Sequence, residues 1–329
     1  MNISLNSRFS QRFDLRSPIA LAPMALAAGG ALAAACARAG ALGLVGGGYG
    51  ELAWTQREYA LAQAAADTGR IGCGFIVWKL DQDASALDWV LEHQPRAIML
   101  SFGDPRPYAK RIAAAGAELL CQVQRVEQVP MALEAGATVI IGQGGEAGGH
   151  GMNALHSRAT ITLVPELADW LAANSPGTLL LAAGGIADGR TLAAVRVLGA
   201  DGALVGSRLW ATQESLAPAG AKAQAVATDG DGTARSSVFD ILRRKNWPAP
   251  YDFRAIRNEL HRKWEGRLDA SLPSVEEARA DYDAGVKADD FSRAHATVGE
   301  AAGLIHDLPQ AAQVIERMSA GAADILGGR

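Results

Sequence analysis

The sequence contains little cysteine, few aromatic residues and no cluster of one charge sign. Its 329 residues include three cysteines, Cys36, Cys73 and Cys121, which lie far apart and form no C-x-x-C pair. Neither a disulfide framework nor a zinc site can be built from this pattern, so we expect small buried thiols in a reducing compartment. Lys and Arg number 31 against 35 Asp and Glu, and no run of five basic residues occurs. This balance argues against nucleic acid as a partner.

The sequence also lacks a long, strongly apolar segment. Residues 17–37 carry no charge and follow several arginines, as the apolar part of a signal peptide would. However, Asp14 lies in the basic region, Pro18 and Pro23 interrupt any helix, and the segment is mostly alanine and glycine. We therefore expect a strand, a proline-containing loop and a buried helix here. This interpretation predicts a cytoplasmic protein without a membrane partner.

Glycine and short apolar runs are abundant instead. Hydrophobic residues make up 49% of the chain and glycine occupies 37 positions. Four alanine-rich helical stretches each end at a glycine that directly precedes an apolar run; these glycines are Gly40, Gly116, Gly136 and Gly199. A glycine after the last helical residue adopts a left-handed conformation and closes the helix. The pattern predicts a repeated helix-to-strand unit.

Eight apolar runs without polar alternation are typical of strands covered on both faces. They are Ile19–Ala22, Leu42–Val45, Gly72–Val77, Ala97–Ser101, Glu118–Val123, Thr138–Ile141, Leu179–Ala183 and Gly202–Val205. Strands that alternate with helices build βαβ units and a parallel sheet. Eight units within about 200 residues favour an α/β fold of the (β/α)8 TIM barrel type, with a doubly wound open sheet as the alternative.

The repeating pattern stops near residue 211, and this change suggests the domain organisation. We expect the barrel in residues 1–211 and a small helical subdomain, without strands, inserted after the eighth strand in residues 212–284. Residues 285–329 then return to an apolar helical period and are expected to complete the barrel. The oligomeric state stays open, a homo-oligomer included.

Glycine-rich segments follow the second, sixth, seventh and eighth apolar runs, where a barrel has its active site. Gly184-Gly185 and Gly206-Ser207 together predict a phosphate cup, since glycine lets backbone N–H groups converge on an anion and a helix begins near Asp188. Plain tight turns would explain either segment alone. The sequence Gly142-x-Gly144-x-x-Ala147 mimics a dinucleotide fingerprint, but the glycines after it cannot continue a helix. No zinc-protease, serine-hydrolase or Walker pattern occurs, and no metal site is expected.

Among the six histidines, His150 is the candidate for catalysis. It lies between two glycines at the expected barrel mouth, without apolar neighbours in sequence, and imidazole titrates near neutrality. His156 in the same region is a second candidate. We expect His261 on a solvated face, and His93, His295 and His306 on helical surfaces.

These loops resemble those of a known family. The segment Gln143–Gly151 is similar to the central motif of the nitronate monooxygenase (2-nitropropane dioxygenase) family of FMN-dependent barrel enzymes. Further similar segments occur in the same order along nearly the whole chain: Ala22-Pro23-Met24, Ala183–Gly189, Gly206–Arg208 with Ala211-Thr212 and Glu214-Ser215, and Val238–Asp240 through Trp247-Pro248, Arg254 and Asn258. The resemblance therefore implies a TIM barrel that binds FMN without a covalent bond.

The resemblance also implies roles for single residues. His150 matches the position of the family's catalytic histidine. The FMN contacts that it implies are Ala22, Pro23, Met24, Gly74, Gln122, Gln143, Gly148, Gly184, Gly185, Leu204, Val205, Gly206 and Ser207. Two positions depart from the family. Gly74 stands where an Asn beside the flavin is common, and Met24-Ala25-Leu26 replaces the Met-Gln-Trp of many NADH:quinone reductases.

The resulting hypothesis is FMN-dependent oxidation of alkyl nitronates, and of nitroalkanes if His150 removes the α-proton, by O2 to a carbonyl compound and nitrite. Flavin carries the redox chemistry, while the protein positions and polarises the substrate. One alternative is an FMN-dependent NAD(P)H:quinone or enoyl reductase on the same barrel. An alternative of another class is a non-redox isomerase or lyase that binds the phosphate of its substrate in the same cup.

Overall fold

A computed structural model describes residues 5–328, and eight parallel strands form its centre. Their order is β1-β9-β8-β6-β5-β4-β3-β2, and a bridge between Ala20 and Leu42 joins β1 to β2. The strands are β1 (Ile19–Leu21), β2 (Gly43–Gly48), β3 (Ile71–Ile76), β4 (Ala97–Ser101), β5 (Glu118–Val123), β6 (Val139–Gln143), β8 (Leu179–Ala183) and β9 (Gly202–Val205). The predicted (β/α)8 barrel is confirmed, and the doubly wound alternative is wrong because the last strand pairs with the first.

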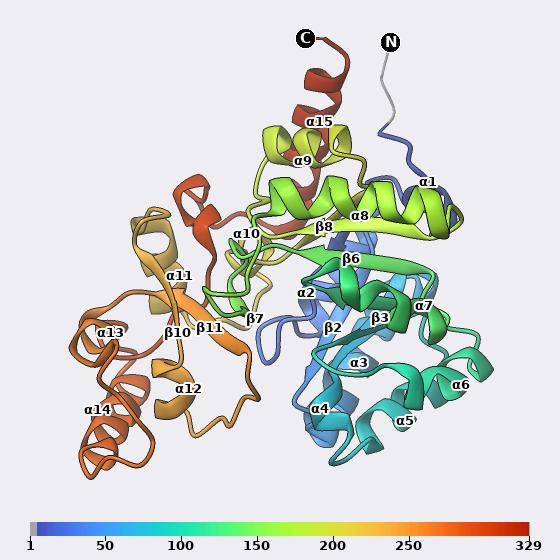
Figure 1. Cartoon of the computed structure of the whole chain (residues 1–329). Helices are drawn as coiled ribbons and strands as arrows, with labels where there is room; N and C mark the ends of the chain where they lie inside the picture. The colour runs from blue at the N-terminus through green and yellow to red at the C-terminus, as the bar shows by residue number, and fades with distance from the viewer. Residues whose placement is uncertain (1–4, 329) are drawn as a thin grey trace.

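Helices surround the barrel (Figure 1). They are α2 (Gly30–Arg38), α3 (Leu52–Ala65), α4 (Val77–Leu80), α5 (Ser85–Glu92), α6 (Arg106–Ala114), α7 (Val129–Glu134), α8 (Thr160–Asn174), α9 (Gly189–Val197) and α15 (Ala311–Leu326), with short 3-10 turns η1 (Thr68–Arg70) and η2 (Val126–Gln128). Helix α15 packs between α9 and α2, although it comes last in the chain. The four helix-ending glycines have φ between 71° and 99°, as expected for left-handed caps.

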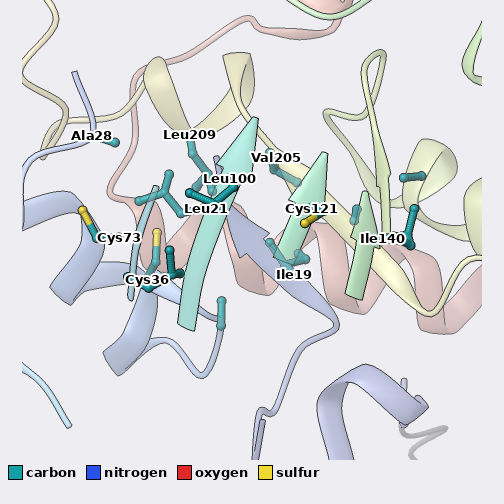
Figure 2. Packing of buried hydrophobic residues seen from close by; sticks show 14 of the residues in the cluster. Ile19, Leu21, Ala28, Cys36, Cys73, Leu100, Cys121, Ile140, Val205 and Leu209 are labelled. Atoms are coloured by element: carbon teal, nitrogen blue, oxygen red, sulfur yellow. The ribbon is translucent and has the colours of Figure 1, made fainter. Parts of the chain in front are cut away.

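Two apolar layers lie on either side of the barrel wall. Side chains such as Leu44, Ile141 and Leu181 fill the interior, which Phe9 and Phe13 join from α1 (Arg8–Arg12). Alternate residues of the same strands face the outer helices, and the three cysteines lie in this outer layer (Figure 2). Burying a large apolar side chain stabilises a fold by roughly 1.5–3 kcal/mol. The filled interior makes the barrel a rigid support for the loops above it.

The segment after β9 is not free of strands, and that part of the sequence prediction was wrong. It contains β10 (Thr233–Ser236) and β11 (Tyr251–Ile256), and β11 pairs with both β10 and β7 (Gly149–Met152) in an antiparallel sheet. Its helices are α10 (Ser207–Trp210), α11 (Ala219–Ala227), α12 (Val238–Leu242), α13 (Glu259–Trp264) and α14 (Val275–Lys287), followed by η3 (Glu300–Leu304). A separate apolar cluster around Phe239 and Tyr282 holds α12, α14 and β11 together. The predicted boundaries at residues 211 and 284 stay predictions.

The apolar N-terminal segment folds as expected, with β1, a loop around Pro23 and the buried helix α2. Within residues 5–328, no helix combines the length and the apolar character that a membrane crossing requires.

Candidate active site

A cavity of about 600 Å³ lies at the carboxyl ends of the barrel strands. Its other side is formed by residues that follow β9, among them Trp247, Phe253 and Tyr282. His150 and twelve of the thirteen residues implied as flavin contacts line this cavity: Ala22, Pro23, Met24, Gly74, Gln122, Gln143, Gly148, Gly184, Gly185, Leu204, Gly206 and Ser207. The exception is Val205, whose side chain is buried in the outer apolar layer (Figure 2). The volume of the cavity is in the range of small-molecule and cofactor sites.

One end of the cavity has the features of a phosphate cup. A Cβ placed on Gly206 would have Ala22 Cβ, at 3.7 Å, as its nearest neighbour, and one on Gly185 would have Glu146 Cβ at the same distance. In the described part of the chain, the N–H groups of Gly185 and Gly206 meet no acceptor. Gly185 also has φ +75°, which a β-branched residue tolerates poorly. Unpaired N–H groups that border open space fit a bound phosphate.

The C-terminal segment completes this cup, which the sequence did not reveal. The Gly299 N–H donates to Ser207 Oγ at 2.9 Å, so the Ser207 hydroxyl hydrogen stays available for a ligand. Gly148 and Gly299 pack backbone against backbone, because a Cβ on Gly148 would lie 2.6 Å from the Gly299 nitrogen. Gly148 is therefore required by this close approach.

A network of amide side chains fixes the base of the cavity. Gln143 Oε1 accepts hydrogen bonds from Gln122 Nε2 at 3.1 Å and from Gln124 Nε2 at 3.0 Å. Its Nε2 donates to the His150 carbonyl at 3.0 Å. Two neighbouring strands, β5 and β6, thus set the orientation of Gln143 and the backbone position of His150. Gln124 had no distinguishing sequence signal.

Pro23 explains why glycine occupies position 74. A Cβ on Gly74 would lie 2.3 Å from Pro23 Cγ and 2.5 Å from Pro23 Cβ. The proline ring fills the space into which a side chain at position 74 would extend. An asparagine cannot be accommodated there unless the Pro23 loop moves.

His150 lies in β7 and is packed on several sides, although its neighbours in the sequence are glycines. Its ring stacks on Trp247 with centroids 3.5 Å apart, and Phe253 lies at 4.7 Å on the paired strand β11. Its Nε2 lies 2.9 and 3.0 Å from the two oxygens of Asp240. Because a carboxylate accepts, Nε2 carries the hydrogen and Nδ1 the lone pair. The sequence could not place Asp240 here, because 90 residues separate the pair.

The protonation of His150 also differs from the sequence expectation. Its side chain is only 8% exposed, and burial lowers its pKa to about 4, although Asp240 acts in the opposite direction. Arg243 and Arg235 lower the pKa further through their charges. The ring is therefore neutral at pH 7.

Two other histidines do not lie on the exposed surface, where the sequence analysis expected them: His261 is buried and His295 is half-buried. His261 is 1% exposed and hydrogen-bonded to Ser236 Oγ, and Tyr282 OH lies 2.6 Å from His295 Nδ1. Burial lowers the pKa of both imidazoles. His156, the second catalytic candidate, is exposed and bonds to Asn153, outside the cavity wall.

Two arginines hold the glycine-rich segment that carries His150. Arg235, from β10, donates to the Ala147 carbonyl at 2.9 Å and to Asp252 at 3.1 Å. Arg254, from β11, donates to the Gly145 carbonyl at 3.1 Å. The antiparallel sheet thus positions a loop that glycine alone would leave poorly defined. No group of three or more His, Cys, Asp or Glu side chains between residues 5 and 328 is arranged to hold a metal ion.

Comparison with solved structures matches this architecture. A structure of FabK from Thermotoga maritima superimposes with a TM-score of 0.83 and 25% identity, over 98% of both chains. A nitroalkane oxidase from Streptomyces ansochromogenes superimposes with a TM-score of 0.80 and 25% identity, over 97% of this chain and 99% of the other.

Sequence comparison gives the family. Residues 51–321 match the family model described as nitronate monooxygenase. The chain is 31% identical to a nitronate monooxygenase from Neurospora crassa, over 95% of this chain and 90% of that relative. It is 32% identical to nitronate monooxygenase npaC from Metarhizium robertsii, over 91% of this chain and 89% of that protein. The chain belongs to the nitronate monooxygenase family of flavin-dependent oxidoreductases.

Proposed function

We propose that the cavity binds FMN and that the protein oxidises alkyl nitronates with O2 to a carbonyl compound and nitrite. The observation that carries this proposal is that the glycine cup and His150 border the same cavity of about 600 Å³. The family and the nitronate monooxygenases among its relatives support nitronate oxidation. Membership of a flavin-dependent family favours redox chemistry over the isomerase or lyase alternative.

The proposed FMN contacts fall into three groups around the cavity. The phosphate would bind at the cup, the polar edge of the ring would face the amide network, and the ring itself would lie on the first and third strand ends. The phosphate group of contacts is Gly184, Gly185, Leu204, Gly206 and Ser207. The contacts to the polar edge are Gln122, Gln143 and Gly148, and those to the ring are Ala22, Pro23, Met24 and Gly74. When bound, the flavin supplies the electron acceptor that protein side chains lack.

His150 is the proposed catalytic residue, and its neutral state favours one form of the substrate. Asp240 holds the tautomer in which Nδ1 carries the lone pair, and no hydrogen bond to Nδ1 occurs within residues 5–328. A base with a pKa of about 4 is poorly matched to removing the α-proton of a nitroalkane at pH 7. A nitronate has already lost that proton. Because Nε2 donates to Asp240 and Nδ1 has no hydrogen, His150 would position a nitronate by contact of its ring, a role that suits it better than deprotonation of a neutral nitroalkane.

Anaerobic mixing tests the proposed reaction. The purified protein should be yellow, should release FMN on heating, and should lose its flavin colour rapidly with propyl-1-nitronate and slowly with NADH. Air should then restore the colour and yield nitrite. A colourless protein that FMN cannot reconstitute would refute the cofactor assignment. Rapid reduction by NADH with inert nitronates would instead support the quinone or enoyl reductase.

Substitution of His150 separates its two proposed roles. In His150→Asn, the α-proton can no longer be accepted, but a hydrogen-bonding side chain stays. If His150 positions the anion by contact of its ring, kcat/KM for propyl-1-nitronate should fall by about tenfold or more, because the anion would be misplaced beside the flavin site. If it acts as a base, neutral 1-nitropropane should be affected far more than the nitronate. Equal kinetics for wild type and variant on both forms would show that His150 has only a structural role.

A further inference from the structure

Arg243 is a positively charged residue on the cavity wall, and one of its guanidinium nitrogens has no hydrogen-bond partner. It follows directly after α12 and lines the cavity together with His150, Trp247 and Phe253. Its guanidinium carbon lies 4.8 Å from the centre of the Phe253 ring, in a cation–π contact. Its side chain is 16% exposed, and its Nη1 is buried without a hydrogen-bond partner.

The acid next to Arg243 does not satisfy this nitrogen. Nη1 lies 3.9 Å from Asp240 Oδ1, which is too long for a hydrogen bond. Both Asp240 oxygens already lie within 3.0 Å of His150 Nε2. Of the buried side-chain atoms without a partner in residues 5–328, Nη1 of Arg243 is the one whose residue lines the cavity. Nη1 itself is closed to the cavity, so an anion there would meet the partly exposed remainder of the Arg243 side chain, whose charge would bind it favourably.

The neighbouring residues show that this is not an ordinary surface cation. Arg244, the next residue, forms a 3.1 Å ion pair with Asp283 and has a side chain that is 49% exposed. Lys245 Nζ lies 4.1 Å from the centre of the Tyr49 ring. Burial, followed by the charge of Arg243, lowers the pKa of Lys245, while Glu51 acts in the opposite direction. Arg244 has a close carboxylate partner, whereas Asp240, the carboxylate beside Arg243, lies 3.9 Å from it and is shared with His150.

We propose that Arg243 is the anion-binding residue of the cavity and takes the planar pair of nitro oxygens of the substrate nitronate. This inference rests on the proposed function for the identity of the anion. A guanidinium offers parallel N–H donors in one plane, and charge-assisted bonds to two coplanar oxygens are the arrangement that it favours. His150 is neutral and cannot supply this charge. The two residues therefore have separate roles: Arg243 binds the anion, and His150 orients it beside the flavin site.

Nitrate is the probe, since it is a planar oxyanion that cannot be oxidised by the proposed reaction. Calorimetric titration of the purified holoenzyme with nitrate should give binding that Arg243→Met weakens by at least tenfold. Arg244→Met is the matched control and should bind nitrate as wild type does. With propyl-1-nitronate, Arg243→Met should raise KM by at least tenfold and change kcat little, and Arg243→Lys should recover part of the loss. The KM for neutral 1-nitropropane should change much less.

The outcomes distinguish the anion site from the proposed function. Unchanged nitrate binding and unchanged nitronate KM in Arg243→Met would overturn the inference and leave nitronate oxidation standing. Nitrate binding that depends on Arg243, in a protein that oxidises no nitronate, would support the anion site and refute the function. If Arg243→Met does not fold, Arg243→Lys is the deciding variant. A folded Arg243→Lys protein would also overturn the inference if its KM for the nitronate and its discrimination between nitronate and nitroalkane equalled those of the wild type.

Discussion

The buried imidazole of His150 should make the protein less stable in acid, with a magnitude that follows from its environment. Burial lowers its pKa from 6.5 to about 4. Between these values the unfolded chain binds a proton at this residue and the folded chain does not, so the free energy of unfolding falls as the pH falls. The 2.5-unit difference corresponds to about 3 kcal/mol once the pH is below 4, and to about 2 kcal/mol at pH 5.

Urea unfolding of wild type and His150→Asn between pH 4.5 and 7.5, followed by tryptophan fluorescence, measures this effect. The variant loses the stacking on Trp247 at every pH, but it has no proton to bind, so the stability difference between the two proteins should shift in its favour as the pH falls. His306→Asn, at an exposed position, is the control for replacing a histidine by asparagine. A pH-independent difference would refute the reasoning. A wild type that gains relative stability in acid would mean that Asp240 holds the imidazole as a cation.

Three further substitutions test other parts of the structure. Gly206→Val should keep the fold but weaken FMN binding by at least tenfold in a fluorescence titration, because its side chain would enter the cup; unchanged affinity would contradict the phosphate site. Arg235→Met should speed hydrogen exchange in residues 144–151, because each buried carbonyl that loses its donor destabilises the loop by about 1–3 kcal/mol; wild-type exchange rates would show that other contacts hold the loop. Phe9→Ala should cost about 3–5 kcal/mol of unfolding free energy and leave FMN affinity unchanged, since Phe9 lies in the barrel interior; a large loss of affinity would disagree with that placement.

The fold could be predicted closely because its signals are local. Each strand is a short apolar run, and a glycine with positive φ ends the helix before four of them. Burial on both faces leaves no room for polar alternation, so the eight runs are distinct in the sequence. The same search missed β10 and β11, although Tyr251, Phe253 and Ala255 alternate with polar residues at 252 and 254. This alternation is typical of a half-buried strand, which a search for unbroken apolar runs overlooks.

The candidate site was predictable where glycine or a motif marked it. The glycines of the cup and His150 were singled out because their residue types are unusual at those places in a barrel. Val205 shows where a motif fails to predict a contact. Adjacent residues of a strand face opposite sides, and of Leu204 and Val205 only Leu204 lines the cavity. His261 is followed by the charged residues Arg262 and Lys263 in the sequence but is buried in the folded chain.

The sequence by itself determined the barrel, the glycine cup and the identity of the candidate histidine, because these depend on residues within one helix-to-strand unit. Only the tertiary structure decided the state and the partners of that histidine. Asp240, Trp247 and Arg243 reach His150 because β11 pairs with β7, which brings a segment about 90 residues away onto the glycine-rich loop. Burial by that segment removes water from the imidazole, and desolvation then lowers its pKa to about 4. No local pattern encodes that burial, because it depends on how distant parts of the chain pack together.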